Sequence, residues 1–270
     1  MLKRNMIVAA AVSVACLSGQ AWGAGFVNGD FETGTDTGWT VGGGYRAGVL
    51  NSALTPASLL PGGALYNTVS GSYPRSAVVG PGVVLGTDGN LNSVFDGNYS
   101  YRLENAGIVG GYGSAISQSV KNYTDANIFF AWAAVLEAAH GTQDGAVFKL
   151  VLRDDTDGVD VLTRTFTAAT GGGGVDARFT QSSTGYFYTT CAGGVTPCLN
   201  NWMIEQLATP VLGHDYTLSL LAADCQPTGH AGWAYLDGFG AIIPKTPEPG
   251  TLGLLGLGVL ALGLTRRRKL

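Results

Sequence analysis

Glycine is the residue that most restricts how this chain can fold. It occupies 42 of the 270 positions, and asparagine, threonine and serine are also common. Such a composition favours many tight turns between short strands over helices. The chain shows no convincing amphipathic helix and no internal repeat. We therefore expect a β-rich body.

Strand-like patterns recur over residues 100–243. Ile128–Leu136 is continuously apolar, as expected of a strand buried on both faces; its alanines would also suit the start of a helix, but its aromatics favour a strand. Asp154–Gly158 has the composition of a hairpin loop. Gly171–Gly174 and Tyr186–Tyr188 fall in a long, poorly patterned insertion that runs to about Asn201. The expected strands are Ser100–Leu103, Ala115–Val120, Ile128–Leu136, Val147–Leu152, Val159–Phe166, Tyr216–Leu221 and Trp233–Ile243. The sequence predicts an all-β fold, an antiparallel β-sandwich.

The N-terminus has the three parts of a secretory signal peptide. Lys3 and Arg4 precede the apolar stretch Met6–Leu17, which is too short to span a membrane, and small residues follow. Cleavage after Gly23 places Ala21 at the minus-three position. Cys16 raises a lipoprotein alternative, but Ser13 stands where a branched apolar residue is expected. We predict a signal peptide over residues 1–23.

The C-terminus carries a second export feature. An apolar run, Leu252–Leu264, is followed by the cations Arg266, Arg267, Arg268 and Lys269, which the positive-inside tendency keeps on the cytoplasmic face. The uncharged stretch Pro249–Leu264 is shorter than the roughly 20 residues of a stable span and contains five glycines, so it suits transient retention. The alternative is a plain C-terminal membrane anchor.

This tail resembles the PEP-CTERM sorting signal of Gram-negative bacteria, with the motif at Pro247, Glu248 and Pro249. The resemblance implies cleavage near the motif by a membrane protease called exosortase. It also implies transient anchoring in the inner membrane, then a place at the cell surface or outside the cell. The resulting division is a signal peptide (1–23), a body (24–244) and a sorting tail (245–270).

The charge of the body excludes one class of partner. Of the 15 Lys and Arg residues, seven lie in the tails, and of the 19 Asp and Glu residues only Glu248 does, so residues 25–244 carry 8 − 18 = −10. Nucleic acid is therefore an unlikely partner, because binding phosphates requires cations. An acidic surface is compatible with divalent cations and neutral polysaccharides.

Three cysteines remain in the exported part. In an oxidising compartment Cys191 and Cys198 can close a short loop, although three single-bridge arrangements with Cys225 are open. Three thiols without a nearby pair of histidines argue against a zinc site. A structural bridge is the preferred interpretation.

The body resembles the galactose-binding-like jelly roll, a fold that includes many carbohydrate-binding modules. The matching residues are Asn28–Glu32, Gly34, Trp39 and the closing Tyr235-Leu236-Asp237. Asp224-Cys225, His230 and Gly232–Asp237 also resemble a segment of bacterial surface proteins of unknown function.

The jelly-roll resemblance implies a structural calcium site. In such folds the opening Phe-Glu and the closing Asp lie on neighbouring strands, where a hard cation can bridge them. Glu32 and Asp237 are the expected ligands, with Asp30 as a third. Asp154–Asp160 has some acids of an EF-hand loop, but Arg153 and Arg164 occupy its first and twelfth places. A hairpin turn is therefore expected there.

Catalytic residue types are present without a catalytic pattern. Gly111–Ala115 does not provide the elbow that a serine nucleophile requires. The remaining residue types that could serve are Glu137, His140, Asp224 and His230. We predict that the protein is not an enzyme.

Sugar binding would use aromatic side chains. The candidates are Trp39, Tyr45, Tyr99, Tyr112, Tyr186 and Tyr188, whereas Trp132 and Trp233 are expected in the core. The leading hypothesis is an exported structural protein of the surface or of an exopolysaccharide (biofilm) matrix. A carbohydrate-binding lectin and a glycan hydrolase are the alternatives. Aromatics exposed on one sheet face would favour the lectin, and a cleft with two facing acids would favour the hydrolase.

Overall fold

The structure, a computed structural model, describes residues 25–46, 48–67, 75–106, 110–208, 210–227 and 229–240. The expected signal peptide and the sorting tail with its apolar segment lie outside these residues. Within the described ranges, no helix is long and apolar enough to span a membrane.

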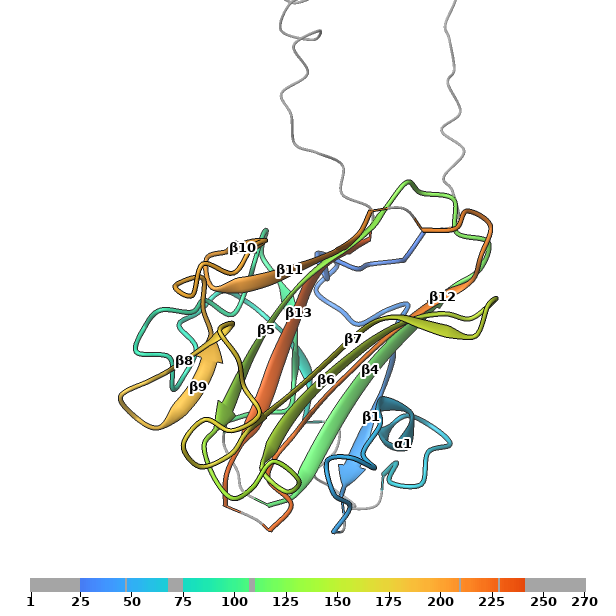
Figure 1. Ribbon diagram of the computed structural model, residues 1–270. Helices are drawn as coiled ribbons and strands as arrows, with labels where there is room; N and C mark the ends of the chain where they lie inside the picture. Colours follow the sequence, from blue (N-terminus) through green and yellow to red (C-terminus); the bar gives the residue numbers. More distant parts are fainter. Residues whose placement is uncertain are drawn as a thin grey trace, which may run out of the picture.

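Short antiparallel strands and one helical turn make up the described fold (Figure 1). The elements in chain order are β1 (Thr40–Tyr45), α1 (Pro56–Leu59), β2 (Ala77–Val79), β3 (Ser100–Leu103), β4 (Tyr112–Val120), β5 (Ile128–Glu137), β6 (Ala146–Asp154), β7 (Val159–Ala168), β8 (Phe179–Gln181), β9 (Tyr186–Thr189), β10 (Cys198–Leu199), β11 (Trp202–Leu207), β12 (Tyr216–Ala223) and β13 (Gly232–Gly240).

The strands form two sheets that face each other (Figure 1). The five-stranded sheet has the order β1-β4-β12-β6-β7, and the other runs β10-β11-β5-β13-β3-β2, with β9 also paired to β5 and β8 to β9. Every strand pair is antiparallel, for example β13 with β5 through Trp233 and Val135. The predicted all-β antiparallel sandwich is confirmed.

All seven predicted strands lie within or overlap observed ones, and the acidic loop joins β6 to β7. The poorly patterned insertion contains β8, β9 and β10, and the prediction missed β1, β2 and β11. In β1 the signal is hidden because Gly42, Gly43 and Gly44 supply no side-chain alternation. Gly42 is needed there, since a Cβ would lie 2.4 Å from the carbonyl oxygen of Leu59.

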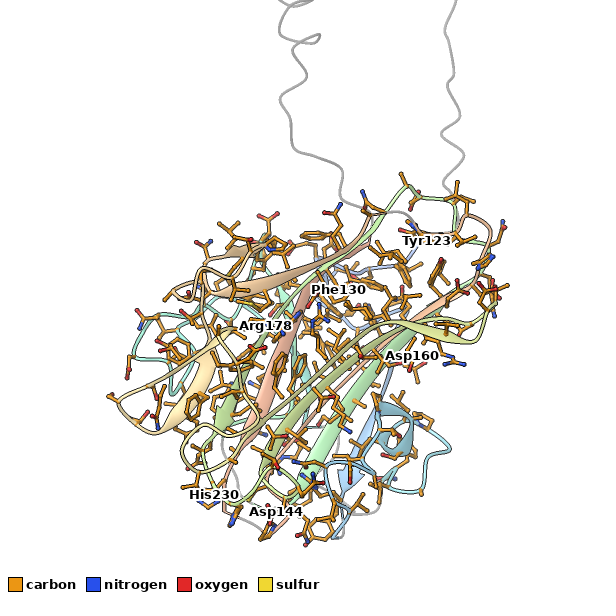
Figure 2. All side chains as sticks on the ribbon, in the orientation of Figure 1. Tyr123, Phe130, Asp144, Asp160, Arg178 and His230 are labelled. Carbon is orange, nitrogen blue, oxygen red and sulfur yellow. A yellow bond between two sulfur atoms is a disulfide. The ribbon has the colours of Figure 1, made fainter. Side chains whose placement is uncertain are left out.

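Aromatic rings fill the space between the sheets. Trp132 stacks on Phe148 and Phe166 with ring centroids 4.9 and 5.6 Å apart. Figure 2 shows Phe130 between the sheets, and this ring is fully buried. Trp132 therefore lies in the core as predicted, and burial of these rings is the main source of stability of such a sandwich.

Each sheet also has a covered outer face. On the larger sheet Trp202, Trp233 and Tyr235 are buried beneath a segment that includes Val84 and Leu91. On the smaller sheet Leu54, Leu59 and Leu65, which flank or belong to α1, cover part of the surface around Ala115 and Leu221. The protein therefore has three layers of apolar packing, and its own loops occupy much of both outer faces.

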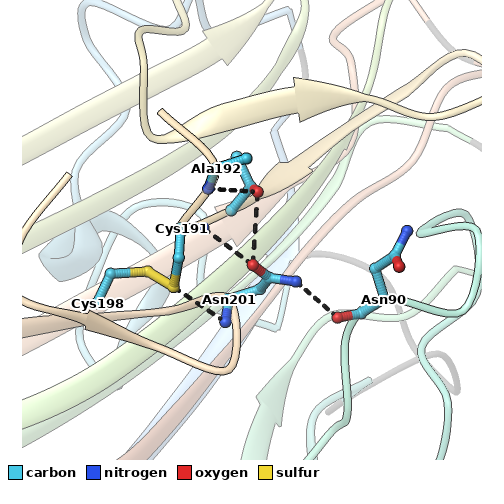
Figure 3. The surroundings of a disulfide bond; sticks show 6 residues. Asn90, Cys191, Ala192, Cys198 and Asn201 are labelled. Atoms are coloured by element: carbon cyan, nitrogen blue, oxygen red, sulfur yellow. Dashed lines mark hydrogen bonds between the residues drawn. A yellow bond between two sulfur atoms is a disulfide. The ribbon is translucent and has the colours of Figure 1, made fainter. Parts of the chain in front are cut away.

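A disulfide joins Cys191 to Cys198 and shapes the insertion (Figure 3). Asn201 organises its surroundings: its Oδ1 accepts a hydrogen bond from the Cys191 amide at 2.9 Å, and its Nδ2 donates to the Asn90 carbonyl at 2.8 Å. The second bond links the loop to the segment that covers the larger sheet. Cys225 is outside this bridge and buried.

Candidate functional site

The Glu32 carboxylate lies against a turn of the chain that precedes β3. Its Oε1 accepts hydrogen bonds from the amides of Asn98 (2.7 Å) and Tyr99 (2.9 Å), and its Oε2 accepts one from Asn98 Nδ2 (3.0 Å). Gly97 permits this approach, because a Cβ there would lie 2.4 Å from Oε1. Partial burial alone would raise the pKa of Glu32, but these hydrogen bonds outweigh it and the pKa is lowered.

Asp237 holds the same turn from the other side. Its Oδ2 accepts from the amides of Phe95 (3.0 Å) and Asp96 (3.2 Å), and its Oδ1 accepts from Gly238 (2.6 Å). The side chain is only 1% exposed. Burial raises the pKa of Asp237 to about 7, and the charge of Glu32 adds to the rise. The two predicted calcium ligands therefore lie close enough to influence each other.

The elements that place Glu32 and Asp237 near each other differ from the prediction. Asp237 lies on β13, but Glu32 lies in an irregular turn and not on a neighbouring strand. The segment Phe95–Tyr99 lies between them and supplies amides to both carboxylates. Asp30 is exposed, and its Oδ1 accepts a weak hydrogen bond from the Glu32 amide at 3.3 Å. We name Glu32, Asp237 and Phe95–Tyr99 the carboxylate clasp.

The donors of the carboxylate clasp suit a hard cation. Negative potential gathers here, because the charge of Asp96 acts to raise the pKa of Glu32 and the charge of Glu32 acts to raise that of Asp237. Carboxylate and carbonyl oxygens are the ligands of Ca²⁺. Each oxygen of Glu32 and Asp237 already accepts an amide hydrogen bond, but a carboxylate has about four acceptor positions, so coordination and these bonds are compatible. The donor types are therefore those of a calcium site, and the calcium site itself stays a prediction.

The acidic β6–β7 loop is a hydrogen-bonded turn, as predicted. Asp154 Oδ1 accepts from the amides of Thr156 and Asp157, both at 3.0 Å, and its Oδ2 lies 2.8 Å from His214 Nδ1. The hydrogen bond to Asp154 raises the pKa of His214. The carboxylate is thus occupied in fixing the turn.

A buried acid pair escaped the sequence analysis. Glu104 and Asp224 are fully buried, and both face Arg75, with N–O distances of 2.6 and 3.8 Å. Burial, followed by the charge of Glu104, raises the pKa of Asp224 to about 8. Ser114 donates to Glu104 at 2.8 Å, while the Gly232 amide donates to Asp224 at 3.2 Å. This acid pair lies at one end of the sandwich. No local sequence pattern predicts it, because Glu104 follows β3 and Asp224 follows β12.

The predicted sugar-binding aromatics do not share one surface. Trp39 and Tyr188 are buried, so the prediction that they contact ligand is wrong; Trp39 stacks on Phe31 and belongs to the core. Tyr45 and Tyr112 pack edge to face at 5.6 Å. Tyr99 is 38% exposed. Tyr186 packs against Trp233 at 5.5 Å.

The four residues considered above as possible catalytic groups form hydrogen bonds or ion pairs within the fold. Glu137 Oε2 accepts from the Ala231 amide at 2.9 Å, and Asp224 belongs to the buried pair. His140 and His230 lie together, with Nε2 and Nδ1 3.1 Å apart.

Comparison with known proteins identifies the tail. Residues 245–269 match the model of the PEP-CTERM protein-sorting motif, so the predicted sorting signal is confirmed and export with C-terminal processing is implied. No curated protein matches the chain.

Among solved structures, the chain is similar to a carbohydrate-binding module, TmCBM61, in complex with β-1,4-galactotriose (13% identity, TM-score 0.35, 80% of this chain and 95% of that one). It is also similar to the CBM28 module specific for non-crystalline cellulose (13%, TM-score 0.31, 79% and 92%). A third is the K1 cleaved adhesin domain of Lys-gingipain from Porphyromonas gingivalis W83 (11%, TM-score 0.34, 78% and 94%).

Proposed function

We propose that this protein is a non-catalytic structural component of a bacterial cell surface or exopolysaccharide matrix. It is exported through its signal peptide, held in the inner membrane by its tail and processed there by exosortase. The observation that carries this proposal is the sorting motif at residues 245–269. The motif directs the sorting of the protein, and the body is the folded β-sandwich that is delivered.

Two features of the body support this role. The Cys191–Cys198 disulfide suits an oxidising compartment outside the cytosol. In addition, the outer-face aromatics Trp202 and Trp233 are buried by the protein's own loops. On the outer face of the smaller sheet, exposed hydroxyls pair across strands, as Ser119 with Thr217 at 2.6 Å. Such a surface favours a building block over a site for one small ligand.

Intact-mass measurement and fractionation test the processing step. In the producing bacterium we expect the mature protein to end near Pro247 and to leave the inner membrane. A variant with Pro247, Glu248 and Pro249 all replaced by alanine should keep its tail and stay in the membrane fraction. A matched control, Thr251→Ala, changes the tail outside the motif. Recovery of wild-type protein with an intact tail contradicts the proposal.

Calcium would stabilise this body through the carboxylate clasp. Glu32 and Asp237 would hold the ion, which supplies positive charge to a buried carboxylate and links the opening turn to β13 by ligand linkage. The chain's residues provide the rest: the amides of Phe95–Tyr99 orient both carboxylates. The expected observation is a calcium-dependent rise in melting temperature that Asp237→Ala removes.

One surface feature favours carbohydrate binding as a second function. A hollow of about 370 Å³ is lined by Val83, Leu85, Gly86 and Thr184, among others. Val83 and Leu85 are 74% and 65% exposed, and the Tyr186 ring lies so close to Gly86 that a Cβ there would approach it to 2.7 Å. Apolar surface beside a tyrosine and hydroxyls is the combination that sugar rings contact.

Binding of the exported protein to the producer's exopolysaccharide and to a glycan panel tests this second function. Saturable binding that Tyr186→Ala weakens and Tyr45→Ala leaves unchanged would support it. No retention with calcium or with chelator removes it and leaves the structural role.

A further inference from the structure

Three side chains outside the proposed functions meet where β5 and β12 end and β13 begins. They are His140, Cys225 and His230, which we name the histidine–thiol cluster. His140 Nε2 lies 3.1 Å from His230 Nδ1, and Cys225 Sγ lies 3.6 Å from the same nitrogen. One ligand atom from each residue lies within 4.8 Å of the other two. Figure 2 shows His230 at the end of the sandwich away from Tyr123.

The fold fixes this arrangement through main-chain pairing. Glu137 and Ala231 exchange contacts: the Glu137 amide donates to the Ala231 carbonyl, and the Ala231 amide donates to Glu137 Oε2, both at 2.9 Å. The Cys225 amide donates to the His230 carbonyl at 2.9 Å. The Gln226 amide donates to the Asp144 carbonyl at 2.7 Å. The loops after β5 and β12 are thereby held together independently of the cluster.

Two of the three spacings between the donor atoms match a tetrahedral metal centre, and the third is below 4.8 Å. Bond lengths of about 2.0–2.1 Å for Zn–N and about 2.3 Å for Zn–S, at tetrahedral angles, place two nitrogens roughly 3.4 Å apart and a nitrogen and a sulfur roughly 3.6 Å apart. The observed distances are 3.1 and 3.6 Å. A thiolate and two imidazoles select zinc-like metals over Ca²⁺ or Mg²⁺.

Two further observations point the same way. His140 has a φ of 58°, in the left-handed region that is strained for a non-glycine residue, and such strain persists where surrounding structure requires it. Cys225 is fully buried, so the fold holds its sulfur against His230.

We propose that His140, Cys225 and His230 bind one Zn²⁺ ion, in a site separate from the carboxylate clasp. Cys225 is fully buried and His140 is exposed, so the site reaches from the interior to the surface of the protein. The ion ties the loop after β5 to the loop before β13. The site is independent of the sorting function and of calcium.

Cobalt(II) is the probe, because tetrahedral Co²⁺ bound to a thiolate absorbs light strongly whereas Zn²⁺ is silent and displaces it. The full-length protein, freed of metal with its disulfide intact, should bind one Co²⁺ with thiolate-to-metal absorption. Zn²⁺ should abolish the band and Ca²⁺ should not. Cys225→Ser should lose the band, and His140→Ala and His230→Ala should each weaken Co²⁺ binding by about tenfold or more.

His214→Ala is the matched control, since His214 is the remaining histidine and contacts Asp154. This variant should keep the thiolate-to-Co²⁺ absorption band with wild-type affinity. Wild-type protein without a thiolate band, or a band of unchanged affinity in both cluster histidine variants, overturns the proposal. If those variants fail to fold, native mass spectrometry of the wild type decides: one retained Zn²⁺ supports the site, and none at tenfold excess overturns it.

Discussion

Strand β13 separates two regions with opposite chemistry. Near the end of β13, Asp237 joins Glu32 in the carboxylate clasp. There, a backbone or side-chain amide donates a hydrogen bond to every carboxylate oxygen. At its start lies the histidine–thiol cluster, where the donor atoms of His140, Cys225 and His230 face one another. The carboxylate clasp can therefore stand without an ion and be strengthened by one, whereas the histidine–thiol cluster gains its strongest contacts only with a metal.

The largest expected effect is the pH dependence of stability. The pKa of Asp237 is raised to about 7 and that of Asp224 to about 8, from 3.8. In each case the folded state binds the proton more tightly, so the free energy of unfolding is highest below pH 4 for these groups and falls as pH rises towards 8. The two shifts set upper limits of about 4 kcal/mol for Asp237 and about 6 kcal/mol for Asp224 on the change in the free energy of unfolding.

Denaturant unfolding at a series of pH values between 4 and 8, in the presence of a chelator, measures the slope of the free energy of unfolding against pH. Asp237→Asn should reduce it, because one titrating group is gone. Calcium should also reduce it, since the ion stabilises the charged carboxylate. A slope that rises with pH through this window would contradict the burial argument.

The next effect is the loss of the Asp237 side chain. Asp237→Ala leaves the amides of Phe95, Asp96 and Gly238 without their acceptor, and buried unsatisfied donors cost about 1–3 kcal/mol each. With partial access of water to this turn we expect about 3 kcal/mol in total, measured by denaturant unfolding in chelator. Asp30→Ala is the control and should change stability by less than about 0.5 kcal/mol. Equal losses in the two variants would show that the carboxylate clasp does not fix the turn.

Zinc should stabilise by a smaller amount that depends on its concentration. At a hundredfold excess over Kd, linkage gives about 2.7 kcal/mol. Thermal unfolding with and without Zn²⁺ measures it, and Cys225→Ser should remove the shift while leaving the calcium response intact. Loss of both responses in this variant would mean that the two regions are not independent.

The sequence predicted the strands with strong side-chain patterns and missed those without. Ile128–Leu136 predicted β5, but the glycines of β1 carry no alternation. The pair Glu32 and Asp237 followed from a resemblance, yet the contribution of Phe95–Tyr99 was unforeseeable because backbone amides have no residue signature.

The histidine–thiol cluster shows more clearly which sites a sequence pattern cannot predict. The sequence argument against zinc relied on the lack of paired histidines, and the fold supplies the pair: His140 and His230 are 90 positions apart in the chain and in contact in space. The pairing of β5 with β13, through Leu136 and Gly232, brings them together. Only the register of that pairing, which no local pattern fixes, could have revealed the cluster.

The smallest expected change in stability tests whether Glu32 is a calcium ligand or only a hydrogen-bond acceptor for the turn. Glu32→Gln keeps an oxygen for the amides of Asn98 and Tyr99 but loses the charge, so in chelator we expect a loss of about 1 kcal/mol, the difference between a charged and a neutral acceptor. If Glu32 also coordinates calcium, the calcium-dependent rise in melting temperature should shrink by more than this loss accounts for, while Asp160→Asn, on β7, should leave it unchanged. An undiminished calcium response in Glu32→Gln would assign Glu32 to the turn alone and leave Asp237 as the acid that responds to the ion.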